Sequence, residues 1–148
     1  MCSSDLRDAG RYLTSHRHDT YEHAWQEAVC LTQRGEIALA EGDAAEAETH
    51  LRAALELSRT WHLVPAMLRS FLAFARLFRS RAEEEQAALL LANAAENPAS
   101  LATTAQSARR ELAELPADLV AAATSQAKGG TVTDVAAALS AGDLPPTG

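Results

Sequence analysis

The sequence contains few of the residues that β-rich or disulfide-bonded folds require. Cys2 and Cys30 are the two cysteines among 148 residues, so neither a disulfide framework nor a CxxC metal knuckle can form. Aromatic residues make up 5% of the chain, and there are 7 glycines and 5 prolines. A β-sandwich or barrel would need more aromatic and β-branched side chains. The composition therefore argues against an all-β fold.

The sequence also lacks the short motifs of common enzyme classes. No GxxxxGK[ST], GxSxG or HExxH pattern occurs. Zinc ligands could be sought among His16, His18, His23 and Cys30. However, His23 and Cys30 lie about 10 Å apart by the rise of a helix, too far for one ion. We therefore expect no catalytic residue, no bound metal and no cofactor, and we do not expect an enzyme.

The charge balance and hydropathy argue against two further kinds of partner. The net charge is −7, and an acidic chain repels phosphate backbones. No apolar run approaches the roughly 20 residues that a membrane span needs. The first residues are polar and show no secretory leader. We expect a cytoplasmic protein that binds neither nucleic acid nor membrane.

Alanine and leucine, with 33 and 20 residues, make up over a third of the chain, a composition that suits packed helices. Gly42 ends a first helix, Asp43 caps the second, and Pro65 fits the first turn of the third. Ser80 and Asn97 are expected to start the fourth and fifth. The predicted helices are 21–41, 43–59, 65–79, 80–95, 97–114, 115–129 and 131–142. Short connections between them favour antiparallel hairpins in an all-α fold.

An internal repeat of 40 residues links the first two hairpins. Leu31, Gly35, Ala38, Ala47, Leu51 and Ala54 recur as Phe71, Ala75, Phe78, Ala87, Leu91 and Ala94. Every position stays apolar or small, so two helices can approach closely in each copy. A longer connector near residues 61–65 would account for the period. The alternative is a generic bundle, since small residues coincide by chance in an alanine-rich chain.

This spacing resembles the tetratricopeptide repeat, a helical hairpin of 34 residues. The matching positions are Leu31, Gly35, Ala38, Gly42, Ala47, Leu51 and Ala54. The chain departs from the family at Arg34, where leucine is preferred, and at Ala38, where an aromatic residue is preferred. In the second copy Ala82 replaces the glycine between the helices. Residues 28–59 therefore resemble the repeat well, residues 65–95 are a degenerate copy, and the match covers under half the chain.

The resemblance implies a short solenoid of stacked helical hairpins that binds protein and catalyses nothing. Residues 21–114 would form the repeats, 115–142 the C-terminal capping helices, and 143–148 a flexible tail. The concave groove would be lined by Val29, Thr32, Glu36 and Leu39. The first helix would be poorly covered near Trp25 and Val29, which favours self-association through that face.

A wider resemblance concerns the order of the C-terminal segments. These are 89–92, 97–100, 109–115, 119–123 and 135–139, and their succession resembles the C-terminal end of large bacterial signalling ATPases and transcription regulators. Met1–Leu6 resembles a translated sequencing adapter, so residues 1–20 are expected to be disordered or artefactual and the chain a fragment. The protein partner would then include upstream domains of the same polypeptide.

Two alternatives to the fragment remain. The chain could be a self-contained helical adaptor. Residues 117–141 could also form a DNA-binding helix-turn-helix, although residues 132–141 contain no Arg, Lys, Asn or Gln to read base edges.

The repeat register predicts the effect of a substitution at Ala47. Ala47 and Ala54 should lie between helices, with Leu51 buried beside them. Ala47→Leu should overpack this crossing and lower the free energy of unfolding by about 1–3 kcal/mol. Thermal melting would measure the change, and a variant as stable as the wild type would contradict the register.

Overall fold

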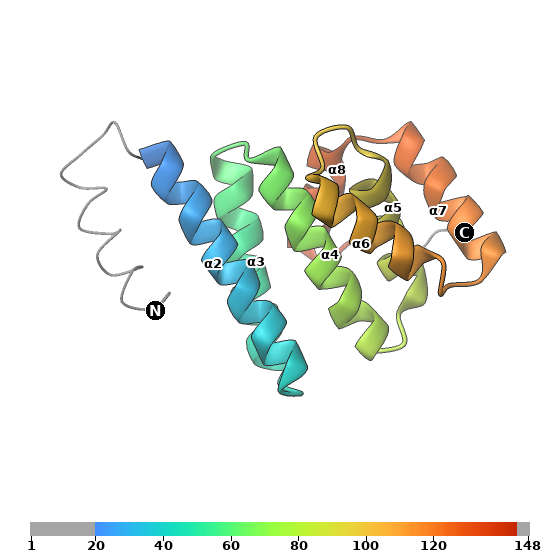
Figure 1. Cartoon of the computed structure of the whole chain (residues 1–148), viewed down its shortest axis with the longest axis horizontal. Coiled ribbons are helices and arrows are strands. Elements are labelled where there is room, and N and C mark those ends of the chain that lie inside the picture. Colours follow the sequence, from blue (N-terminus) through green and yellow to red (C-terminus); the bar gives the residue numbers. More distant parts are fainter. Residues whose placement is uncertain (1–19, 145–148) are drawn as a thin grey trace.

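A computed structural model describes residues 20–144, and this part of the chain is built from helices without any strand (Figure 1). The helices are α2 (Thr20–Ala40), α3 (Ala44–Thr60), α4 (Val64–Ser80), α5 (Glu84–Glu96), α6 (Ala102–Leu112), α7 (Ala117–Gly129) and α8 (Val132–Ala141). The all-α prediction is confirmed. The expectations for the N-terminal segment and for most of the tail fall on residues 1–19 and 145–148, outside the described residues.

The first three connections are the same turn, spaced at intervals of twenty residues. Gly42, His62 and Ala82 have φ angles of 82°, 53° and 59°, in the left-handed region. In each case the N–H of the next residue donates to the carbonyl five residues earlier, over 2.8 to 2.9 Å. This pattern caps the last carbonyls of a helix and turns the chain back. The connector near residues 61–65 is therefore no longer than the others, and the 40-residue period comes from the 17-residue helices α3 and α4.

Several predicted helix ends are confirmed. A side-chain oxygen of Asp43 accepts a hydrogen bond from the N–H of Glu46 at 3.0 Å, which caps α3. Pro65 stands in the first turn of α4, where its missing N–H costs nothing. Thr131 accepts from the N–H of Asp134 at 3.1 Å and caps α8.

Two predicted helix starts are wrong. Ser80 does not cap α5 but is the last residue of α4, where its hydroxyl donates to the carbonyl of Leu77. Asn97 does not begin α6, because its side-chain oxygen accepts from the N–H of Ala99 at 2.8 Å. That bond holds residues 97–100 in a turn, and α6 begins five residues later.

The main core lies around the hairpin of α4 and α5. All nine residues from Ala87 to Ala95 on α5 are buried, so this helix is covered on every side. Phe71 and Phe74 of α4 are fully buried against it. The alanines of α5 allow its neighbours to approach closely from several directions, which explains how α4, α6 and α7 all contact it.

In the first hairpin the predicted repeat positions form a close helix crossing. Ala47, Leu51 and Ala54 are fully buried, and Ala38 is 3% exposed. A Cβ atom on Gly35 would lie 2.5 Å from Leu51 Cδ2, so no side chain fits there unless Leu51 moves. Leu31 is half-buried. At the equivalent place in the second hairpin stands Ala75, which is also fully buried.

A second, smaller core cluster lies near the start of α2. Ala24 and Ala28 pack there against Leu63 and Ala66, with Trp25 partly buried at the edge. Val29 is also half-buried. Both side chains are thus partly covered, and self-association through this face stays a prediction. In residues 20–144 the large apolar side chains that are exposed are Tyr21, Ile37 and Leu101.

The helices divide into two layers (Figure 1). Helices α2, α4 and α6 contact one another in sequence, while α3 lies beside α2 and α4, and α7 lies beside α5. Helix α8 returns to the first two hairpins and packs on α3 and α4, burying Val132, Ala136 and Leu139. The last helix therefore joins two hairpins rather than adding a third to the end of the stack.

The turn at Ala82 predicts a stabilising substitution. Ala82 is exposed, so Ala82→Gly loses little contact and removes the strain of a left-handed alanine. We expect the free energy of unfolding to rise by about 0.5–1 kcal/mol. Chemical denaturation would measure it.

The matched control is Ala53→Gly on the exposed face of α3, in ordinary helical conformation. In this variant the free energy of unfolding should fall by about 1 kcal/mol, because glycine is unfavourable within a helix. If Ala82→Gly were destabilising like the control, the left-handed turn would be wrong.

Candidate functional site

The layer formed by α2, α4 and α6 carries a shallow groove of about 220 Å³. The lining residues are Glu36, Arg69, Leu72, Arg76, Thr103, Thr104 and Ser107. The α4 residues among them stand three and four positions apart and therefore share one face of that helix. One helix from each of three successive segments thus contributes side chains to a single surface.

The groove contains one arginine that is paired and one that is not. The Nε of Arg76 donates to the Glu111 carboxylate at 3.0 Å. Arg69 has no ion pair or side-chain hydrogen bond with any residue from 20 to 144. Thr104 is 4% exposed, and its hydroxyl has no hydrogen-bond partner in the same range. A guanidinium and a hydroxyl without partners can both donate to a ligand that supplies a hydrogen-bond acceptor.

The start of α6 adds positive potential to this side of the groove. Its N-cap residue, Leu101, gives no side-chain hydrogen bond, so the first N–H groups of the helix lack a cap. Uncapped N–H groups and the helix dipole both favour negative charge. Arg69 adds a positive charge to this groove, and Glu36 adds a negative one.

Of the four predicted groove residues, Glu36 lines the groove. Thr32 is 1% exposed and donates to the carbonyl of Ala28 at 3.0 Å, with the hydroxyl of Ser70 at 3.4 Å. It lies between α2 and α4, so assigning it to a ligand surface is wrong. Leu39 is half-buried against the main core. Val29 is half-buried and is not part of this lining.

Sequence reasoning missed the contributions of α4 and α6. Arg69 and Arg76 stand two turns apart on a helix whose other residues are almost all apolar. An arginine pair at this spacing on such a helix was the available signal. The serine and threonines of α6 gave none, because hydroxyl side chains are common at helix starts.

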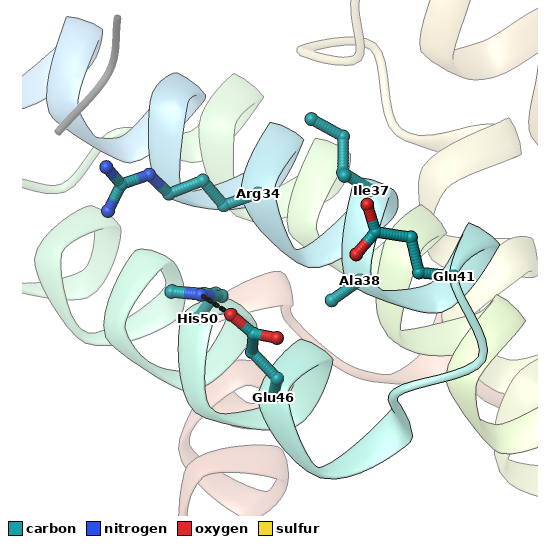
Figure 2. A pocket seen from close by; sticks show the side chains of 6 residues that line it. All are labelled: Arg34, Ile37, Ala38, Glu41, Glu46 and His50. Atoms are coloured by element: carbon teal, nitrogen blue, oxygen red, sulfur yellow. Dashed lines mark hydrogen bonds and ion pairs between the residues drawn. The ribbon is translucent and has the colours of Figure 1, made fainter.

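Two other hollows are present in the described part of the chain. One, of about 440 Å³, lies where α5 and α7 end and α8 begins, and includes Asn93 and Lys128. The Asn93 side-chain amide donates to the carbonyl of Leu89 at 2.9 Å. The other, of about 340 Å³, lies between α2 and α3 (Figure 2).

An ionic cluster ties α8 to the first two hairpins. Glu48 of α3 accepts from Arg52 at 2.9 Å and from Arg81 at 2.7 Å. Arg52 also donates to the carbonyls of Leu139 and Ser140 at 3.2 and 3.3 Å, which caps the end of α8. The hydrogen bond from Arg81 lowers the pKa of Glu48, and Arg52 lowers it further against the opposing effect of burial. This cluster is explained by its role in holding helices together.

Glu56, two turns further along α3, makes a second link to α8. Its carboxylate accepts hydrogen bonds from Ser140 and Arg59, and these lower its pKa. Both links fix the same end of α8, so the last turn of that helix is bound to α3 at two points.

The described residues also bear on metal binding and membrane insertion. No group of three His, Cys, Asp or Glu side chains within residues 20–144 could hold a metal ion. Of the zinc candidates, His16 and His18 lie outside the described residues. No helix in the same range is long and apolar enough to cross a membrane.

A family model matches residues 16–145, which is most of the chain. The family is Alpha-E, described as a predicted alpha-helical domain with a conserved ER motif. No glutamate in this sequence is directly followed by an arginine, so that motif assigns no role to a residue here. Comparisons with curated proteins and with solved structures found no match.

The ionic cluster predicts how stability changes with pH. Because folding lowers the pKa of Glu48 from 4.5, its contribution is present above pH 4.5 and is lost as the pH falls through the folded-state value. Glu48→Gln should lower the free energy of unfolding by about 1 kcal/mol at pH 7, and by progressively less in acid.

Chemical denaturation at a series of pH values would measure this difference. Glu85→Gln is the control, because Glu85 is exposed and has no ion pair within residues 20–144. A Glu48→Gln deficit that stayed constant down to pH 3 would contradict the linkage.

Proposed function

The chain belongs to the Alpha-E family of helical domains, and we propose that it is a non-catalytic protein–protein interaction module. The groove across α2, α4 and α6 would hold a segment of the partner protein. The observation that carries this proposal is Arg69, which lines the groove without a partner in residues 20–144, beside Thr104.

The dimensions of the groove favour an extended peptide segment. Three neighbouring helices, with axes about 8–10 Å apart, span roughly 20 Å. An extended chain rises about 3.3 Å per residue, so about six residues would cross the groove. Leu72 offers an apolar contact, while Arg69 can bind a carboxylate through two parallel hydrogen bonds. The segment would therefore carry an acidic side chain near an apolar one.

The tetratricopeptide-like architecture is part of the same proposal. It is supported by the close approach of Gly35 to Leu51 and by equivalent turns at Gly42 and Ala82. It is also supported by the contacts that link α2, α4 and α6. A solenoid of this kind exposes one face of successive helices for binding.

We also propose a place for the module within a larger bacterial signalling or transcription-regulating ATPase, in the cytoplasm. The support is the order of C-terminal segments in the sequence. In-frame coding sequence for an ATPase upstream of the gene would support this assignment, and a stop codon directly upstream would favour the self-contained adaptor. The helix-turn-helix alternative has less support, because α8 buries one face on α3 and α4 and carries no basic residue.

The groove can be tested with a displayed library of random peptides selected against the wild-type chain. Peptides that bind should share an acidic position and lose at least tenfold in affinity for Arg69→Glu, because charge reversal repels the same carboxylate. Arg110→Glu is the matched control, since Arg110 is exposed on α6 and is not part of the groove lining.

Fluorescence titration would measure both affinities, with circular dichroism to confirm folding. Equal binding to Arg69→Glu and to the wild type would overturn the proposed groove. Selected peptides that carry no acidic position would overturn the expected partner chemistry.

A further inference from the structure

The outer edge of α2 carries a second surface, distinct from the groove. It is defined here as the α2 edge and consists of Arg34, Ile37, Ala38 and Glu41 of α2 with Glu46 and His50 of α3. Figure 2 shows Ile37 projecting beside the hollow of about 340 Å³, with Arg34 and Glu41 to either side of it. Ile37 is 58% exposed, so a large apolar side chain stands uncovered at the centre of this edge.

The charges on the α2 edge are of opposite sign and are not used within the fold. Arg34 and Glu41 make no ion pair with any residue from 20 to 144. Glu46 is engaged by His50, whose Nε2 lies 3.4 Å from the carboxylate. The edge therefore offers one free cation and one free carboxylate, separated by the exposed Ile37.

The order of these three residues along α2 is self-complementary. Arg34 and Glu41 are equally far from the midpoint between Ile37 and Ala38, at opposite ends of a stretch of about 10 Å. If a second α2 lies antiparallel across that midpoint, each Arg34 falls opposite the Glu41 of the other copy. The same operation places each Ile37 opposite the Ala38 of the other copy, which lines the hollow there. A two-fold interface requires this kind of pairing, in which residue i contacts j and j contacts i.

We propose that the α2 edge is a homodimer interface, whose occupant is the α2 edge of a second copy of this chain. Ile37 of each copy enters the hollow between α2 and α3 of the other. Arg34 of each copy pairs with Glu41 of the other, close to Glu46. The charges on the α2 edge favour association in this orientation, and burial of the two isoleucines stabilises the dimer.

The size of this surface sets the expected strength. One exposed isoleucine and one ion pair per copy bury less than the roughly 1,200 Å² of a standard interface. The dimer is therefore weak and reversible, and forms in the high micromolar range. It leaves the groove open, because Arg69, Thr103 and Ser107 belong to helices that the α2 edge does not include. The proposal does not rest on the groove.

Charge exchange tests the pairing. Sedimentation velocity at increasing concentration should show wild-type dimers, while Arg34→Glu and Glu41→Arg should each weaken dimerisation at least tenfold. The double variant Arg34→Glu/Glu41→Arg should restore it, because the exchanged charges again face each other. Ile37→Asp should abolish the dimer, and Arg110→Glu, on exposed α6, should leave it unchanged.

Three results would overturn the proposal. The first is a wild-type chain that stays monomeric up to about 1 mM. The occupant of the α2 edge would then be residues 1–19 or another protein. The second is a dimer that Arg34→Glu does not weaken. The third is a double variant that dimerises no better than either single variant. Circular dichroism on each variant separates loss of the interface from loss of the fold.

Discussion

A single residue in left-handed conformation at each reversal of the chain sets the geometry of the first two hairpins. At positions 42, 62 and 82 it lets the next N–H reach the carbonyl five residues back, so the helix ends and the following helix runs antiparallel to it. Because α3 and α4 have the same length and the same turn follows each, equivalent residues recur every forty positions. The register of small residues at the helix crossings follows from this spacing. Within the first hairpin, Gly35 of α2 meets Leu51 of α3 closely.

The sequence predicted the helices wherever a local signal agreed with the final packing. Gly42 and Asp43 mark a turn that needs a left-handed residue and a cap. Gly42 adopts the left-handed conformation, and the side chain of Asp43 caps α3. His62 and Ala82 adopt the same turn, although neither residue type signals a left-handed conformation. Asn97 closes a turn instead of starting a helix, and an asparagine before proline can do either. The local sequence does not decide between them.

The groove was harder to predict than the fold. The tetratricopeptide-like pattern directs attention to one helix, α2, but α4 packs against that helix and covers Thr32. In the proposed groove the unpaired cation comes from the next helix in the layer, where Arg69 makes no ion pair within residues 20–144. Which face of α2 stays accessible depends on how closely α4 packs. That packing is a property of the assembled layer and is not encoded in any one helix.

The binding of α8 by Arg52 joins residues 87 and 88 positions apart in sequence, whereas most helix contacts link neighbours along the chain. Contacts between neighbouring helices form early in folding, and contacts that close long loops form late. We therefore expect α8 to pack onto α3 and α4 after the two hairpins have formed. It is also the first element to be released when the chain is pulled from its C-terminal end. Amide protons of α8 should exchange with solvent through this local opening, well before the interior of α5 becomes accessible.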